Sequence, residues 1–174
     1  MPELIAKSAL FGRAPLTVAG TTLAEAALGQ ITSIACFPGT KEAVAARLGG
    51  FPEPNRTRAN LIWTGPDQAF LMGIPAPDLG GLAAVTDQSG GWAGLRLSGK
   101  LAEAALMRLY PLDLRSKAFP PGSCARAPLV HMQSVLVREA EGFLIMVFRS
   151  MARTAWTELE ETLQKLEARA AVGP

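Results

Sequence analysis

The chain has 174 residues, of which 49% are hydrophobic, and a formal net charge of +2 from 17 basic and 15 acidic side chains. A chain of this length buries roughly 70% of the surface that it exposes when unfolded, so it can form one domain without disulfides or metal. Because its arginines and lysines are spread along the sequence rather than gathered in a stripe, we expect binding neither to nucleic acid nor to a membrane surface.

The first 30 residues are mixed in composition and show no regular periodicity. We expect an arm over residues 1–30, with one turn of helix at residues 23–28. Gly12, Arg13 and Pro15 interrupt any apolar run, so no signal peptide is expected there. Residues 31–170 are predicted to form a single α+β domain.

The first part of this domain reads as strand, helix and hairpin. Residues 31–37 favour a strand, and residues 41–48 favour a helix that Thr40 can cap and Gly49 can end. Residues 59–64 and 69–73 are then predicted to form a hairpin.

The second part repeats this order about 60 residues later, which indicates an internal repeat. A strand is predicted over residues 92–97, a helix through Leu109, and a hairpin of strands near residues 130–138 and 143–148. The predicted fold class is therefore α+β, with two strand–helix–hairpin units that form a mixed or antiparallel sheet with helices packed on it.

Residues 143–148, Phe-Leu-Ile-Met-Val-Phe, are apolar without alternation. This pattern is typical of a strand that is covered on both faces, and the run is far too short to cross a bilayer. We expect the last helix to cover one face. The other face is covered either by another part of this chain or by a second polypeptide.

The last helix is the clearest element. Ser150 is expected to cap it, Trp156 to pack on the sheet, and Glu161 to pair with Lys165 one turn later. Its apolar residues recur at helical spacing: Ala152, Trp156, Leu159, Leu163 and Leu166.

No catalytic or metal-binding group stands out. His131, the one histidine, lies in an apolar segment, where a structural role is commoner than a catalytic one. Cys36 lies between a strand and a helix but has no basic neighbour, so we expect a core thiol. Cys36 and Cys124 are far apart in the sequence, which favours a reduced, cytoplasmic setting; a disulfide between them is the alternative. One histidine and two distant cysteines do not supply the four ligands of a zinc site. No phosphate-binding loop is present, so we expect no FAD, FMN or NAD held by this chain alone.

Three residues are candidates for contact with a ligand or a partner. Asp87 begins a tight turn, Asp-Gln-Ser-Gly-Gly, in which the glycines are expected to adopt positive φ; a ligand role is the alternative. Arg149 and Arg153 lie at the start of the last helix, where the dipole disfavours cations. They are either solvated or they reach a carboxylate or carbonyl of a partner.

The order of several segments resembles a known family. Residues 85–92, 95–99, 110–114, 118–123 and 148–156 read VTDQSGGW, LRLSG, YPLDL, AFPPGS and FRSMARTAW. This order is similar to that in the gamma subunit of heterotetrameric sarcosine oxidase. More distantly, it resembles the folate-binding domain of glycine-cleavage aminomethyltransferases. The resemblance covers residues 31–168.

The resemblance implies a fold like that folate-binding domain and a non-catalytic subunit of a flavin-dependent complex. Such a complex demethylates sarcosine oxidatively to glycine and passes the one-carbon unit to tetrahydrofolate. Alpha, beta and delta subunits are the implied partners, and FAD, FMN, NAD and tetrahydrofolate are implied to lie in other subunits, with no cofactor in this chain.

A comparison with the aminomethyltransferases supports an inactive chain. Those enzymes carry an acidic pair before the strand that leads into the hairpin, whereas the matching residues 129–134 contain no acid. We therefore expect this chain alone to be inactive. A free-standing folate- or pterin-binding module is the alternative, and an independent enzyme that uses Cys36 or His131 is a third, weaker one.

Overall fold

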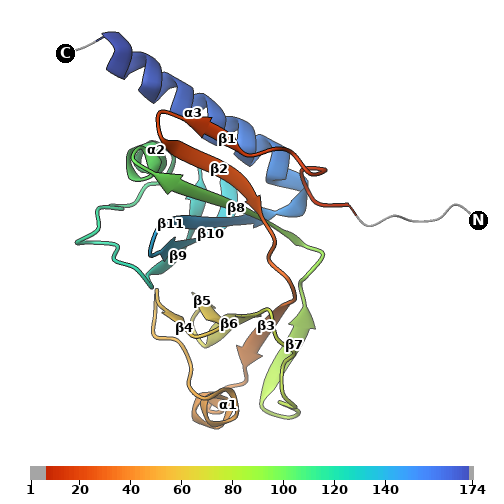
Figure 1. Cartoon of the computed structure of the whole chain (residues 1–174). Helices are drawn as coiled ribbons and strands as arrows, with labels where there is room; N and C mark the ends of the chain where they lie inside the picture. Colours follow the sequence, from red (N-terminus) through yellow and green to blue (C-terminus); the bar gives the residue numbers. More distant parts are fainter. Residues whose placement is uncertain (1–6, 173–174) are drawn as a thin grey trace, which may run out of the picture.

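The computed structural model describes residues 7–172 and contains two antiparallel sheets that face each other, with helices on their outer faces (Figure 1). The first sheet has the order β1 (Leu16–Val18), β2 (Thr21–Ala26), β8 (Trp92–Gly99), β11 (Gly142–Phe148), β10 (Met132–Glu139) and β9 (Cys124–Leu129). The second has the order β4 (Thr57–Arg58), β5 (Leu61–Gly65), β6 (Gln68–Met72), β3 (Ile31–Cys36) and β7 (Ala83–Asp87). The helices are α1 (Lys41–Leu48), α2 (Ala102–Leu109) and α3 (Ala152–Val172), the last preceded by a 3-10 turn, η1 (Arg149–Met151).

The two sheets repeat one strand order, which confirms the predicted internal repeat. The run β4-β5-β6-β3 in one sheet corresponds to β9-β10-β11-β8 in the other, and a helix follows β3 and β8 alike. The next strand is exchanged between the units: β2, which precedes β3 in the chain, pairs with β8, whereas β7, which precedes β8, pairs with β3. Each sheet therefore contains one strand, β2 or β7, that is followed in the chain by the first strand of the other sheet's unit.

The segment predicted as an arm contributes β1 and β2 to the six-stranded sheet, and the helical turn predicted at residues 23–28 is wrong. Thr21, Leu23 and Ala26 are buried, and Leu23 packs in the same core as Leu95 and Leu97 of β8. Ala24 and Ala26 weaken the strand signal of this segment, because alanine is depleted in strands. The boundary predicted at residue 30 falls between β2 and β3, which belong to different sheets.

Both faces of β11 are buried, as predicted, and residues of this chain cover both of them. Phe143, Ile145 and Val147 face the core beneath α2 and α3, whereas Leu144 and Met146 face the core between the sheets. A third core lies between the five-stranded sheet and α1, around Val44. The strand is therefore central to a layered fold, and its apolar sequence needs no second polypeptide.

Helix ends agree only partly with the expectations. Thr40 lies at the start of α1, but its hydroxyl donates to the carbonyls of Phe37 and Leu82 instead of capping the helix, while Gly49 ends the helix with a φ of 72° as predicted. Ser150 does not cap α3, because it lies inside the 3-10 turn that precedes the helix. Within residues 7–172, no helix is long and apolar enough to cross a membrane.

Trp156 is buried beneath α3, as predicted, with 1% of its surface exposed. Its indole Nε1 donates to Glu160 Oε2 at 3.0 Å, and the Arg13 guanidinium lies 4.8 Å from its ring. The predicted pair of Glu161 and Lys165 is also present, at 3.0 Å.

Candidate functional site

The fold does not bring His131 to a nucleophile. His131 is exposed in the two-residue turn that joins β9 to β10, where Leu129 pairs with Met132 and Val130 adopts a φ of 56°. The apolar neighbours of His131 in the sequence therefore do not bury it. Within residues 7–172, no group of three or more histidine, cysteine or acidic side chains is placed to hold a metal ion.

Both cysteines are free and neither is activated. Burial, helped by the nearby Asp67 carboxylate, raises the pKa of the Cys36 thiol, which is the opposite of what a nucleophile needs. Cys124 is fully buried, and its Sγ donates to the Trp63 carbonyl at 3.5 Å. Cys124 is thus buried in the core. Cys36, predicted to be a core thiol, is half-buried at the edge of the core around Val44.

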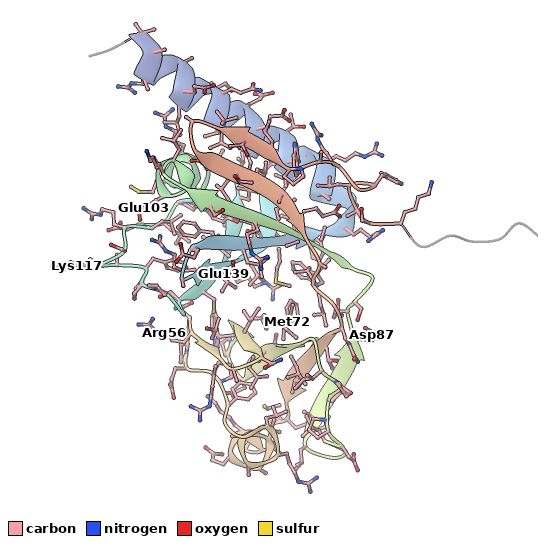
Figure 2. The ribbon with its side chains drawn as sticks, in the orientation of Figure 1. Arg56, Met72, Asp87, Glu103, Lys117 and Glu139 are labelled. Carbon is pink, nitrogen blue, oxygen red and sulfur yellow. The ribbon has the colours of Figure 1, made fainter. Side chains whose placement is uncertain are left out.

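A cleft of about 480 Å³ lies between the two sheets, and we call it the inter-sheet cleft. Leu144 and Val137 form one apolar wall, and Ile62 and Met72 form the opposite wall. Figure 2 shows Met72 on the five-stranded sheet and Glu139 on the six-stranded sheet, and both residues line this cleft. Sequence analysis did not identify this cleft, because its walls come from strands that are more than fifty residues apart in the chain.

The inter-sheet cleft contains an arginine and a carboxylate that bind each other. Arg96 Nε donates to Glu139 Oε2 at 2.7 Å, and Arg96 Nη2 donates to Oε1 at 2.9 Å. These hydrogen bonds raise the pKa of the Arg96 guanidinium. Because Glu139 is the one carboxylate among the residues that line the cleft, and both its oxygens are occupied, no free general base is present on these walls.

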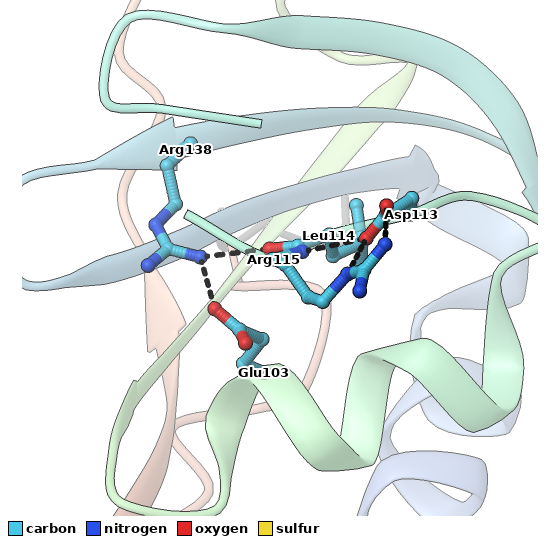
Figure 3. A network of polar contacts seen from close by, with 5 residues as sticks. All are labelled: Glu103, Asp113, Leu114, Arg115 and Arg138. Atoms are coloured by element: carbon cyan, nitrogen blue, oxygen red, sulfur yellow. Dashed lines mark hydrogen bonds and ion pairs between the residues drawn. The ribbon is translucent and has the colours of Figure 1, made fainter. Parts of the chain in front are cut away.

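Arg138 also lines the inter-sheet cleft, but its guanidinium contacts α2 and the loop that follows it (Figure 3). Its Nη1 lies 3.2 Å from Glu103 Oε2 and 3.3 Å from the Leu114 carbonyl. In the same loop, hydrogen bonds from Arg115 lower the pKa of the Asp113 carboxyl to about 2. These contacts hold the loop in place and keep Asp113 ionised, so we infer a structural role for this segment.

Asp87 is the last residue of β7 and begins the turn that leads to β8 of the other sheet (Figure 2). Its Oδ1 accepts hydrogen bonds from the Ser89 amide at 2.9 Å and the Ser89 hydroxyl at 2.6 Å, which lower the pKa of Asp87. Ser89 Oγ in turn accepts from the Ile31 amide at 3.0 Å. The turn is thus built as predicted, except that Gly90 and Gly91 do not adopt positive φ. A ligand or partner role for Asp87 stays a prediction.

Arg149 and Arg153 lie beside residues 7–13, which we call the N-terminal strap. Arg149 donates to the Lys7 carbonyl, and the Arg153 guanidinium lies 4.8 Å from the Phe11 ring centroid. A groove of about 630 Å³ runs between the strap and the start of α3. Sequence analysis missed Phe11, since a lone aromatic residue in an aperiodic segment gives no signal. Contact of the two arginines with a partner stays a prediction.

No known protein family and no curated protein sequence matches the chain. Among solved structures, it is similar to a chain of the heterotetrameric sarcosine oxidase from Corynebacterium sp. U-96 in complex with pyrrole 2-carboxylate, with a TM-score of 0.75. The similarity covers 86% of this chain and 88% of that chain at 23% sequence identity. The two chains share one fold. This finding confirms, at the level of fold, the resemblance that the sequence shows and the predicted α+β class.

Proposed function

We propose that this chain is the gamma-type subunit of a flavin-dependent heterotetrameric sarcosine oxidase, with a structural and assembly role in the cytoplasm. The observation that carries the proposal is the coverage of the structural similarity, 86% of one chain and 88% of the other. The two chains therefore correspond over nearly their whole lengths, which favours equivalent subunits over a shared small motif.

The residues of this chain support a structural role more than a catalytic one. The carboxylate in the inter-sheet cleft is neutralised by Arg96, the Cys36 thiol has a raised pKa, and His131 is exposed on a hairpin turn. We propose that the alpha, beta and delta subunits hold FAD, FMN, NAD and tetrahydrofolate and carry out the oxidative demethylation of sarcosine. In that case this chain contributes contact surfaces for the other subunits and stabilises the complex.

Co-expression with the genes encoded beside this chain tests the proposal. We expect a yellow complex that contains this chain and consumes oxygen when sarcosine is added. Expressed alone, the chain is expected to be colourless and inactive. If the chain purifies as a monomer and never co-purifies with a flavoprotein encoded beside it, the proposal fails.

The second candidate is a free-standing module that binds folate or a related pterin, and the inter-sheet cleft favours it. Its volume of about 480 Å³ lies within the range of small-molecule sites, and its walls combine apolar side chains with Arg96 and Asn60. Micromolar binding of tetrahydrofolate by the isolated chain, lost in Arg96→Ala but kept in the surface variant Arg108→Ala, would support this function. Absence of binding at millimolar ligand would remove it.

A further inference from the structure

We propose that the N-terminal strap and the start of α3 form a docking surface for an acidic segment of a partner protein chain. The surface consists of Lys7, Phe11, Arg149 and Arg153, and we call it the strap surface. The proposal rests on the proposed function, since it names the kind of contact that this chain makes in its complex.

The strap surface carries three positive side chains, and Glu25, a carboxylate that contacts the strap, accepts hydrogen bonds from Ser8 Oγ and the Leu10 amide. The ion pairs found within residues 7–172 involve other basic side chains, and none includes Lys7, Arg149 or Arg153. Arg149 and Arg153 also lie at the N-terminal end of α3, where the helix dipole already adds positive potential. A carboxylate from another chain would be attracted by both arginines and by the dipole.

Phe11 has an unfavourable backbone conformation. Its φ of 57° lies in the left-handed region, which is unfavourable for a bulky side chain. A turn holds it there, because the Phe11 amide donates to the Ser8 carbonyl and the Gly12 amide donates to the Ser8 hydroxyl. Yet 59% of Phe11 is exposed, so residues 7–172 do not compensate this strain by burying the ring. Strained residues of this kind concentrate at functional sites.

The strap surface combines basic side chains with an aromatic ring. Arg153 and Lys7 lie 4.8 Å and 5.7 Å from the centroid of the Phe11 ring. Arginine and aromatic residues are enriched at protein interfaces, and a cation beside an aromatic face becomes more favourable when water is excluded. Burying the ring under a partner would therefore strengthen contacts that already exist.

The groove beside Phe11 has a volume of about 630 Å³, which is room for side chains of a short peptide segment. Its polar lining includes Ser8, Ser150 and the two arginines, which match a carboxylate and backbone carbonyls. A nucleic acid would need a wider basic stripe than three residues on a chain with a net charge of +2. We therefore assign the surface to a protein segment that carries at least one aspartate or glutamate beside an apolar side chain.

Charge reversal in the co-expressed complex tests the proposal. The variant Arg149→Glu/Arg153→Glu places acids at the start of α3, which suits the helix dipole, so the isolated chain is expected to keep or raise its unfolding temperature. Recovery of the complex is expected to fall at least about tenfold, and wild-type association is expected to weaken as salt rises. Arg108→Glu/Arg169→Glu, which reverses two exposed arginines elsewhere, should leave recovery unchanged.

The outcomes separate this inference from the proposed function. If the wild-type complex forms and the reversed variant is recovered equally well, the strap surface is not a docking site, whereas the proposed function stands. If the wild-type chain forms no complex, the proposed function and this inference both fail. A homodimer of the isolated chain that the reversal abolishes would assign the surface to a second copy and overturn the proposed partner. Loss of recovery in Phe11→Ala, with the fold retained, would support the aromatic part of the argument.

Discussion

Arg96 on β8 and Glu139 on β10 join across β11, the strand that lies between them in the six-stranded sheet, with nitrogen–oxygen distances of 2.7 and 2.9 Å. The pair lies on the wall of the inter-sheet cleft, so it links three strands and removes free charge from the cleft at the same time. A wall built in this way suits either a structural subunit or a site that binds a ligand by displacing one of the two side chains.

Breaking this pair should cost little stability. Both side chains are partly exposed, at 52% and 32%, and exposed ion pairs contribute about 0–1 kcal/mol. We expect Arg96→Ala and Glu139→Ala each to lower the free energy of unfolding by about 1 kcal/mol or less, measured by urea denaturation. A double-mutant cycle should give a coupling of about 0.5 kcal/mol, and an additive double variant would show that the pair contributes nothing.

Truncation of Trp156 should be far more costly. The indole is 1% exposed, packs between α3 and the sheet, and donates to Glu160 at 3.0 Å. Trp156→Ala is expected to lower the free energy of unfolding by about 3–5 kcal/mol because it leaves a cavity in the core. Trp156→Phe, which keeps an aromatic ring, should lose less. A loss below about 1 kcal/mol for the alanine variant would contradict the packing described here.

Gly99 is the position where an added methyl group should be most harmful. Its φ is 112°, and a Cβ built there would clash with the carbonyl oxygen of Gly20 and lie 2.8 Å from the Thr21 Cα, so the strands β2 and β8 would have to separate. Strain and overpacking each cost about 1–3 kcal/mol. We expect Gly99→Ala to lower the free energy of unfolding by at least about 2 kcal/mol. Gly90→Ala, where a Cβ meets nothing within 4 Å, is the control and should be near neutral.

The elements that the sequence predicted well are those with strong local signals. The helix at residues 41–48 is confirmed because Gly49 stops it, and α3 is confirmed because Trp156, Leu159 and Leu163 recur at helical spacing. The unbroken apolar run in β11 correctly indicated burial on both faces. In each case the residues themselves determine the local structure.

The features that sequence analysis missed depend on distant partners. The strand β2 is recognisable only once β8 lies beside it, since its alanines carry no strand signal of their own. The exchange of β2 and β7 between the sheets is a property of topology, which no local pattern encodes. In the candidate site, the pairing of Arg96 with Glu139 depends on a register across three strands, and the contact of Arg153 with Phe11 depends on where the N-terminal strap lies.

Alkaline pH should destabilise the protein through Cys124. Burial raises the pKa of its thiol to about 11 from an ordinary value of 9.0. Between pH 9 and pH 11 the unfolded chain releases a proton that the folded chain keeps, so the free energy of unfolding falls as the pH rises. The stabilisation is complete below pH 9 and is lost as the pH approaches 11.

Urea denaturation at several pH values under reducing conditions measures this effect. One differential proton corresponds to a slope of at most about 1.4 kcal/mol per pH unit, and Cys124→Ala should lower the wild-type slope between pH 9 and pH 11. Cys36→Ala is the matched control: its thiol is only half-buried, so the slope should change less. Equal slopes in wild type and Cys124→Ala would show that this thiol titrates alike in the folded and unfolded chains, which contradicts a raised pKa in the core beside Trp63.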